Sequence, residues 1–325
     1  MIVLGIETSA HTIGIGIVEN NKILANSKKM FPIKDRGIIP AKVAEFHAQN
    51  IHKVIKNALN TANIKITDID AVSYTKGPGI GSCLRIGQIA AKTISKQFNK
   101  QIFPVNHSLA HIEITKTLFN LKDPLVVYLS GGNSQILALK QLPFKHYHIY
   151  GETFDIGIGN ALDNFARAAK LIPSWGSSVA KIAENGRYIK MPYNVKGMDF
   201  NFTGILKYSI ELLNKNNISD IAYSFQETMF SMICEASERA LFLLNKKELI
   251  LCGGVAQSKR LQEMMNIISK SHNTKFCVAS NEFNADNGAM IAIVGEKMLE
   301  QNISYNLNEA TIDQKFRIDK CEVKW

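Results

Sequence analysis

Two histidines, His107 and His111, stand four positions apart in the segment Asn-His-Ser-Leu-Ala-His-Ile-Glu. On a helix this spacing places both imidazoles on one face, close enough to bind a single metal ion. Such a pair is as often structural, so the spacing alone leaves both interpretations open. Metalloproteases of the thermolysin type need a glutamate directly after the first histidine, and Ser108 stands there instead. The motif therefore disfavours that class of protease.

A complete metal site needs further ligands from distant parts of the chain. Asp286 precedes an apolar helical segment, where a carboxylate can bind a metal or cap the helix. Tyr128 lies near the end of an apolar run, just before the turn at 130–133, where a phenol can bind a metal or pack in the core. Two imidazoles and a carboxylate with open positions suit iron(II) or zinc, and an added phenolate favours iron.

Four turns rich in glycine or hydroxyl residues are candidate anion sites, at residues 7–9, 77–81, 130–133 and 253–254. Main-chain amides at such turns and at helix starts point towards phosphates, although tight turns explain glycine equally well. The chain has neither a P-loop nor a Rossmann glycine pattern. The four turns together favour a nucleotide held between two halves of the chain.

The elements that must position these residues form two similar series. Residues 2–18 and 125–140 each predict a β-hairpin with a polar turn, and helical periodicity and a strand–glycine–helix unit follow each hairpin. The predicted helices cover 43–62, 82–98, 222–244 and 257–269, and the additional strands cover 70–74 and 248–252. This order predicts a duplicated α/β protein of 325 residues with two domains.

Composition limits the class of protein further. Apolar residues make up 46% of the chain and charged residues 20%, as in folded globular proteins. The formal net charge of +10 favours a polyanionic partner, and Lys28, Lys29, Lys34 and Arg36 form one basic cluster that could meet phosphates. Five widely spaced cysteines and the lack of a signal-like or membrane-spanning run predict a cytoplasmic protein without membrane contact.

The motifs along the chain resemble those of the archaeal and eukaryal tRNA threonylcarbamoyl transferases, once labelled sialoglycoprotein endopeptidases. The matching segments include GIETSAHT, TKGPGIGSCLRIG, NHSLAHIE, YLSGGNSQ, DIGIGNALDNFARA, CGGVA and DNGAMIA, in the family's order. The resemblance extends from Gly5 to near Trp325.

This resemblance implies an actin-like fold of the ASKHA, ribonuclease H-like class, with two lobes and a nucleotide cleft between them. We expect an N-terminal lobe over residues 1–122, completed by 300–325, and a C-terminal lobe over 123–299. The implied reaction moves a threonylcarbamoyl group from threonylcarbamoyl-adenylate to the exocyclic amine of the adenosine beside the anticodon, in tRNAs reading ANN codons. The implied partners are tRNA and the KEOPS subunits, namely a small dimerising subunit and a kinase-like ATPase subunit.

The resemblance also assigns residues to a site. One iron ion, or zinc, would be held by His107, His111, Tyr128 and Asp286. The two histidines and the aspartate would also be the catalytic residues. Asp163 would hold the ribose hydroxyls of the adenine nucleotide, with Gly176 and Ser258 nearby. The nucleotide would lie against Tyr128, Leu129, Ser130, Gly131, Gly132 and Asn133.

The chain departs from the family pattern at three places. Only Gly176 remains of a Pro-Gly-Gly-Pro loop, and Ala180 stands where the family has an acid. Ser258 replaces an asparagine, and Phe46-His47 keeps one histidine of two. Two alternatives remain open: a small-molecule phosphotransferase of the same fold class, and a non-catalytic scaffold that binds metal and nucleotide.

Overall fold

The structure is a computed structural model that describes residues 1–32 and 39–325, so Lys34 and Arg36 of the predicted basic cluster lie outside the described residues. The chain forms two compact units, which are described separately. Unit 1 consists of Met1–Asn120, Lys140–Tyr147 and Asn281–Trp325, and unit 2 consists of Leu121–Leu139 and His148–Ser280. In the described part of the chain, no helix has the length and apolar character needed to cross a membrane.

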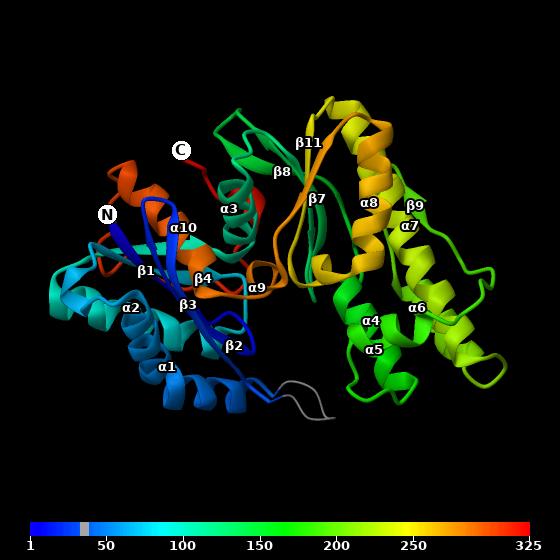
Figure 1. Cartoon of the computed structure of the whole chain (residues 1–325), viewed down its shortest axis with the longest axis horizontal. Helices are drawn as coiled ribbons and strands as arrows, with labels where there is room; N and C mark the ends of the chain where they lie inside the picture. The colour runs from blue at the N-terminus through cyan, green and yellow to red at the C-terminus, as the bar shows by residue number, and fades with distance from the viewer. Residues whose placement is uncertain (33–38) are drawn as a thin grey trace. The chain divides into compact units, whose positions relative to one another are not determined.

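Unit 1 is built on a five-stranded sheet in the order β3-β2-β1-β4-β5. The strands are β1 (Ile2–Glu7), β2 (Thr12–Glu19), β3 (Lys22–Met30), β4 (Ala71–Gly77) and β5 (Gln101–Asn106). The helices are α1 (Pro40–Ala62), α2 (Gly81–Phe98), α3 (His107–Phe119), α9 (Asn281–Asn284) and α10 (Gly288–Glu300), with short 3-10 turns at Ile66–Asp68 and Ile318–Lys320. Figure 1 shows α1 and α2 on one side of this sheet and α3 and α10 on the other. Coverage of both faces explains why β1 and β4 are buried along nearly their whole length rather than at every second residue.

Glycines let α10 lie directly on the sheet. A side-chain carbon on Gly16 would lie 2.1 Å from the main-chain nitrogen of Ala289, and one on Gly5 would lie 2.3 Å from that of Ala292. Neither position has room for a larger residue, because both neighbours are backbone atoms. The beginning of α10, and the turn just before it, are therefore held against β1 and β2.

Unit 2 contains a second five-stranded sheet, in the order β12-β11-β6-β7-β8. The strands are β6 (Leu125–Leu129), β7 (Ser134–Lys140), β8 (His146–Glu152), β11 (Glu248–Cys252) and β12 (Lys275–Val278), and a small hairpin pairs β9 (Val195–Lys196) with β10 (Asp199–Phe200). The helices are α4 (Ile158–Ala168), α5 (Gly176–Ala183), α6 (Thr203–Leu212), α7 (Ile218–Leu244) and α8 (Lys259–Ser271), with a 3-10 turn at Gly254–Gln257. Buried side chains of β6, α4 and α7 form the main core of this unit.

The two sheets have the same topology. In unit 1, β1 pairs antiparallel with β2 and parallel with β4, and β4 pairs parallel with β5. In unit 2, β6 pairs antiparallel with β7 and parallel with β11, and β11 pairs parallel with β12. The predicted duplication of an α/β design is therefore confirmed.

The predicted hairpins and helices are present to within a few residues at each end. The compact units, however, follow a different division from the expected lobes of 1–122 with 300–325 and of 123–299. Residues 281–299, which carry α9 and α10, pack in unit 1. The apolar periodicity of α10 predicts a helix but does not indicate which sheet the helix covers.

Candidate functional site

Helix α3 begins at the end of β5 and carries both predicted histidines. Asn106, the last residue of β5, caps the helix by accepting a hydrogen bond from the main-chain nitrogen of Leu109 at 3.0 Å. His107 and His111 lie on one face of the first helical turns, with ring centroids 4.8 Å apart. His107 is 8% exposed and His111 is 1% exposed. The predicted helical placement of both imidazoles is confirmed.

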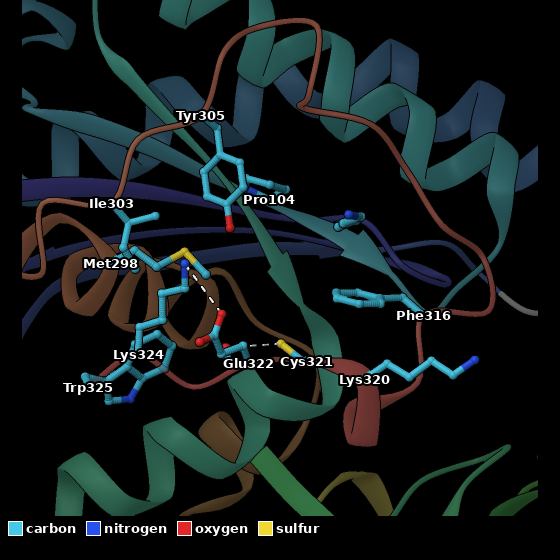
Figure 2. A pocket seen from close by; sticks show the side chains of 11 residues that line it. Pro104, Met298, Ile303, Tyr305, Phe316, Lys320, Cys321, Glu322, Lys324 and Trp325 are labelled. Carbon is cyan, nitrogen blue, oxygen red and sulfur yellow. Dashed lines mark hydrogen bonds and ion pairs between the residues drawn. The ribbon is translucent and has the colours of Figure 1, made fainter. Parts of the chain in front are cut away.

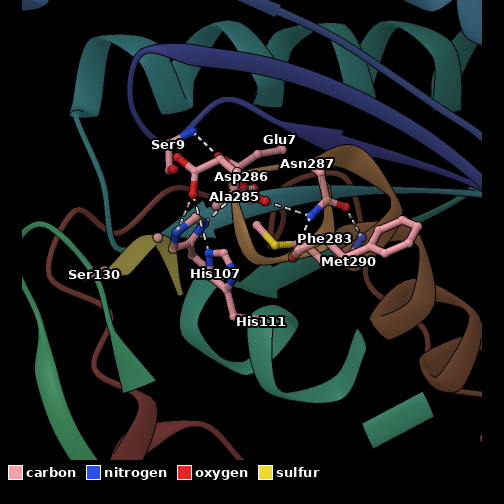
Figure 3. A network of polar contacts seen from close by, with 12 residues as sticks. Glu7, Ser9, His107, His111, Ser130, Phe283, Ala285, Asp286, Asn287 and Met290 are labelled. Carbon is pink, nitrogen blue, oxygen red and sulfur yellow. Dashed lines mark hydrogen bonds and ion pairs between the residues drawn. The ribbon is translucent and has the colours of Figure 1, made fainter. Parts of the chain in front are cut away.

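Asp286 reaches the same point from the turn before α10. Its Oδ1 lies 3.5 Å from Nε2 of His107 and 3.3 Å from Nε2 of His111. Asp286 was a candidate cap of α10, but the next residue caps this helix. The side chain of Asn287 accepts a hydrogen bond from the main-chain nitrogen of Met290. The carboxylate of Asp286 is therefore available to the two imidazoles (Figure 3).

The three side chains fit a metal ion. One ligand atom from each lies within 4.8 Å of the other two. Bonds of about 2.0–2.2 Å to one ion place tetrahedral ligand atoms about 3.3–3.6 Å apart, which matches the two distances from Asp286 to the imidazoles. Two imidazole nitrogens and one carboxylate oxygen are also a usual donor set for iron(II) or zinc.

The electrostatics of the cluster favour a cation. Burial alone would lower the pKa of His107, but the Glu7 and Asp286 carboxylates beside it raise that pKa to about 9. Burial alone would raise the pKa of Asp286, but a hydrogen bond from His111 and the charge of His107 hold it well below its usual value. The pKa of His111 is lowered, chiefly by burial. Without a metal the cluster keeps a proton on His107, so metal binding must release that proton.

Glu7, at the end of β1, is a member of this cluster that the sequence did not reveal. The sequence grouped it with Thr8 and Ser9 as an anion-binding turn, but its side chain is fully buried and its Oε2 lies 3.0 Å from Nδ1 of His107. Burial would raise the pKa of Glu7, but His107 lowers it below the usual range. The signal in the sequence is an acid that ends an apolar strand, because a buried carboxylate needs a partner.

The predicted glycine loop at residues 77–81 is closely packed. A side-chain carbon on Gly77 would lie 1.7 Å from the main-chain oxygen of Asp313, and one on Gly79 would lie 2.7 Å from that of Ser9. Contact with neighbouring backbone therefore explains these two glycines without a phosphate.

The predicted nucleotide loop belongs to unit 2 and joins β6 to β7. Tyr128 and Leu129 are buried at the end of β6, and the turn closes with a hydrogen bond from the main-chain nitrogen of Ser130 to the main-chain oxygen of Asn133. The main-chain oxygen of Gly131 accepts a hydrogen bond from the nitrogen of Asn160, in the first turn of α4. Gly132 has open space where a side chain would be. The turn is thus hydrogen-bonded to the start of α4, and no other residue packs against the side-chain position of Gly132.

The other predicted nucleotide residues also belong to unit 2. Oδ1 of Asp163 accepts a hydrogen bond from the main-chain nitrogen of Gly176 at 2.8 Å, so these two residues are brought together. Ser258 caps α8 by accepting from the main-chain nitrogen of Leu261. The structure thus gives Asp163 and Ser258 local hydrogen bonds, and their contact with a nucleotide stays a prediction. The assignment of Tyr128 to the metal also stays a prediction, because Tyr128 lies in unit 2 and the other candidate ligands lie in unit 1.

Unit 1 also has a pocket of about 130 Å³ between β5 and the C-terminal segment (Figure 2). Tyr305, Phe316 and Trp325 contribute aromatic walls, and Lys76, Lys320 and Lys324 contribute positive charge. None of the metal-site residues lines this pocket, so it is separate from the candidate site.

Comparison with known proteins identifies the family. The family model described as tRNA N6-adenosine threonylcarbamoyltransferase (TsaD) matches residues 21–293. A protein of that name from Thermococcus sibiricus is 45% identical over the full length of both chains, and one from Danio rerio is 39% identical over 100% of this chain and 99% of its own. Among solved structures, HypF of T. kodakarensis aligns over 93% of this chain and 48% of its own with a TM-score of 0.60 at 14% identity. The expected actin-like α/β fold is confirmed, and the chain belongs to the family of tRNA N6-adenosine threonylcarbamoyltransferases.

Proposed function

We infer that this chain transfers a threonylcarbamoyl group from threonylcarbamoyl-adenylate to the exocyclic amine of the adenosine next to the anticodon, in tRNAs that read ANN codons. The observation that carries the proposal is the convergence of His107, His111 and Asp286 in a member of this family. His111 and Asp286 are 175 positions apart in the chain, yet their side chains are in contact and present atoms that can bind one ion.

The metal in this proposal is one iron ion, with zinc as the substitute. His107, His111 and Asp286 supply three ligands, and Tyr128 is the proposed fourth. A phenolate from Tyr128 would favour iron over zinc. When bound, the ion supplies positive charge that polarises the carbonyl of the threonylcarbamoyl group.

The adenylate in this proposal lies against the turn at residues 130–133, beside Tyr128 and Leu129. Main-chain amides of such a turn suit the phosphate, and Asp163 can accept hydrogen bonds from the ribose diol. Gly176 supports Asp163 through the hydrogen bond already described, and Ser258 offers a hydroxyl near the second glycine turn. Ala180, which stands at an acid position of the family, would contribute no polar contact.

The reaction requires a bond exchange at one carbonyl carbon. The tRNA amine attacks this carbon, the bond to the adenylate oxygen breaks, AMP leaves with the electron pair, and the amine loses a proton. Holding both substrates in place removes much of the entropic barrier to this exchange. The role proposed for this chain is therefore to bind and orient the substrates.

The net charge supports tRNA as a partner, and the family resemblance implies the KEOPS subunits. The net charge of +10 suits tRNA, and the KEOPS subunits, a small dimerising subunit and a kinase-like ATPase subunit, would complete the tRNA-binding surface. Each of the five cysteines is a buried free thiol, which is consistent with the proposed cytoplasmic location.

The test uses the purified chain with threonylcarbamoyl-adenylate, unmodified tRNA and its partner subunits. Mass spectrometry of the nucleosides should detect threonylcarbamoyladenosine, and metal analysis should detect about one ion per chain. His107→Ala should lose both the product and the metal while keeping the fold. Phosphate transfer from ATP to a small molecule would identify a phosphotransferase instead. Bound metal and nucleotide without any product would identify a scaffold.

A further inference from the structure

We propose that Glu7 is a positioning residue that fixes the tautomer and orientation of His107, so that this imidazole presents Nε2 to the metal. The inference rests on the metal site of the proposed function. It concerns a residue that does not itself bind the ion.

Both oxygens of Glu7 are held in place. Oε2 lies 3.0 Å from Nδ1 of His107 and also accepts a hydrogen bond from Oγ1 of Thr75 at 2.6 Å. Oε1 accepts a hydrogen bond from the main-chain nitrogen of Ser9. Figure 3 shows the carboxylate of Glu7 beside the His107 ring, with a dashed line between the two. The side chain is fully buried, so no water competes for these contacts.

The geometry selects one tautomer of His107. A carboxylate only accepts hydrogen bonds, and Nδ1 has the shorter carboxylate contact, 3.0 Å to Glu7 against 3.5 Å from Nε2 to Asp286, so the proton of a neutral ring belongs on Nδ1. The neutral ring then has its lone pair on Nε2, and Nε2 is the atom that lies 3.5 Å from Asp286. Metal-binding histidines commonly use this arrangement, with the second ring nitrogen donating to a carboxylate.

The sheet holds Glu7 in this position. β1 pairs with β4 in parallel register, with Ile6 opposite Tyr74, so Glu7 at the end of β1 lies beside Thr75 of the neighbouring strand. Burying a carboxylate costs several kcal/mol unless partners compensate it. An apolar residue at the end of β1 would avoid that cost, so the presence of Glu7 favours a role in the site rather than in stability alone.

The test compares zinc affinity between variants of the full chain. Glu7→Gln keeps the size of the side chain but loses the charge that orders His107. We expect its dissociation constant for Zn²⁺, measured by competition with a chromophoric chelator, to rise by about 10–100-fold. Glu7→Asp keeps the charge and should recover part of the affinity. Unfolding in urea, followed by circular dichroism, reports whether each variant is folded.

Glu113→Gln is the matched control. Glu113 is also a buried acid of unit 1, on the same helix as His107, but it pairs with Lys116 at 3.2 Å and with Nε1 of Trp325 at 3.0 Å. We expect this variant to lose stability and to bind Zn²⁺ as tightly as the wild type. Equal loss of affinity in both variants, or wild-type affinity in Glu7→Gln, would overturn the proposal.

A spectroscopic signature separates positioning from a purely structural role. Nitrogen-15 spectra of the metal-free protein, recorded at a pH where the His107 ring is neutral, should show the proton of that ring on Nδ1, and Glu7→Gln should mix the two tautomers. A protein that binds Zn²⁺ through His107 but transfers no threonylcarbamoyl group would refute the proposed function and leave this inference intact. A neutral ring protonated on Nε2 in the wild type would refute this inference and leave the function intact.

Discussion

The side chain of Asn106 connects the helix of the two histidines to the main chain at Phe316. Its Nδ2 donates a hydrogen bond to the main-chain oxygen of Phe316 at 2.9 Å, while its Oδ1 caps α3 at the nitrogen of Leu109. One buried amide therefore satisfies two main-chain groups. The residue next to it is the proposed metal ligand His107, so the C-terminal segment helps to fix the start of the candidate site.

Replacement of Asn106 by alanine should destabilise the protein by about 2 kcal/mol, from a lost cap of about 1 kcal/mol and the loss of the bond to the partly buried carbonyl of Phe316. Asn106→Ser should lose less, because a serine hydroxyl can still cap the helix although it does not reach Phe316. Urea unfolding of both variants measures the difference. Equal losses would show that the cap contributes nothing, and an unchanged stability of Asn106→Ser would show that the bond to Phe316 contributes nothing.

Asp286 and Asn287 are neighbours with different roles, so their variants should differ in what they lose. Asp286→Ala should lose metal binding with little effect on α10, because it removes a ligand but not the cap. Asn287→Ala should keep the metal ligands and lose about 1 kcal/mol of stability with the cap. Chelator competition and urea unfolding measure the two effects. A loss of α10 in Asp286→Ala would contradict this division.

Gly16 should tolerate no side chain, because an added carbon would lie 2.1 Å from the backbone of α10. Gly16→Ala should lower the free energy of unfolding by about 3 kcal/mol or more, as expected for an overpacked site. Gly204→Ala is the control, since Gly204 begins α6 with open space around it, and alanine there should stabilise the helix slightly. Thermal unfolding compares the variants, and a neutral Gly16→Ala would show that α10 can move away from the sheet.

His47 should make stability depend on pH. It is fully buried in α1, and burial, opposed by the nearby Glu7 charge, lowers its pKa from 6.5 to about 4. Between these two values the unfolded chain holds more protons than the folded one, so the free energy of unfolding must fall as the pH drops from 6.5 towards 4. The loss should reach at most about 3 kcal/mol.

Urea unfolding at pH 7 and pH 5 tests this expectation. His47→Gln should lose less stability between the two values than the wild type does. His52→Gln, on the exposed side of the same helix, should behave as the wild type. An unchanged pH dependence in His47→Gln would assign the effect to other groups.

The sequence predicted the parts of the site that depend on local spacing. His107 and His111 share a helix, so their four-residue separation was sufficient to place them together. Glu7 is 100 positions from His107, and their contact depends on how β1, β4 and β5 pair, which spacing along the chain does not express. Residues 130–133 were likewise predicted as a turn, but their bonds to the first residues of α4 were not.

Asp286 shows a second limit of the sequence. Asp286 and Asn287 are both good helix caps, and only the main-chain conformation decides which of them serves. In the structure, Asn287 is the residue that caps α10. The fold class was easier to predict, because a repeated hairpin, helix and strand order is a long pattern that single substitutions do not obscure.

Unit 1 is assembled from stretches of chain that the ribosome makes at very different times. The strands β1 to β5 emerge early, whereas α10, which covers them, follows the whole of residues 148–280. A nascent chain therefore exposes one apolar face of this sheet until α10 has been translated, and a chaperone that shields this surface should raise the yield. Asp286 directly precedes α10 in the chain, so a polypeptide terminated before this helix would lack both the cover of its sheet and the third proposed metal ligand.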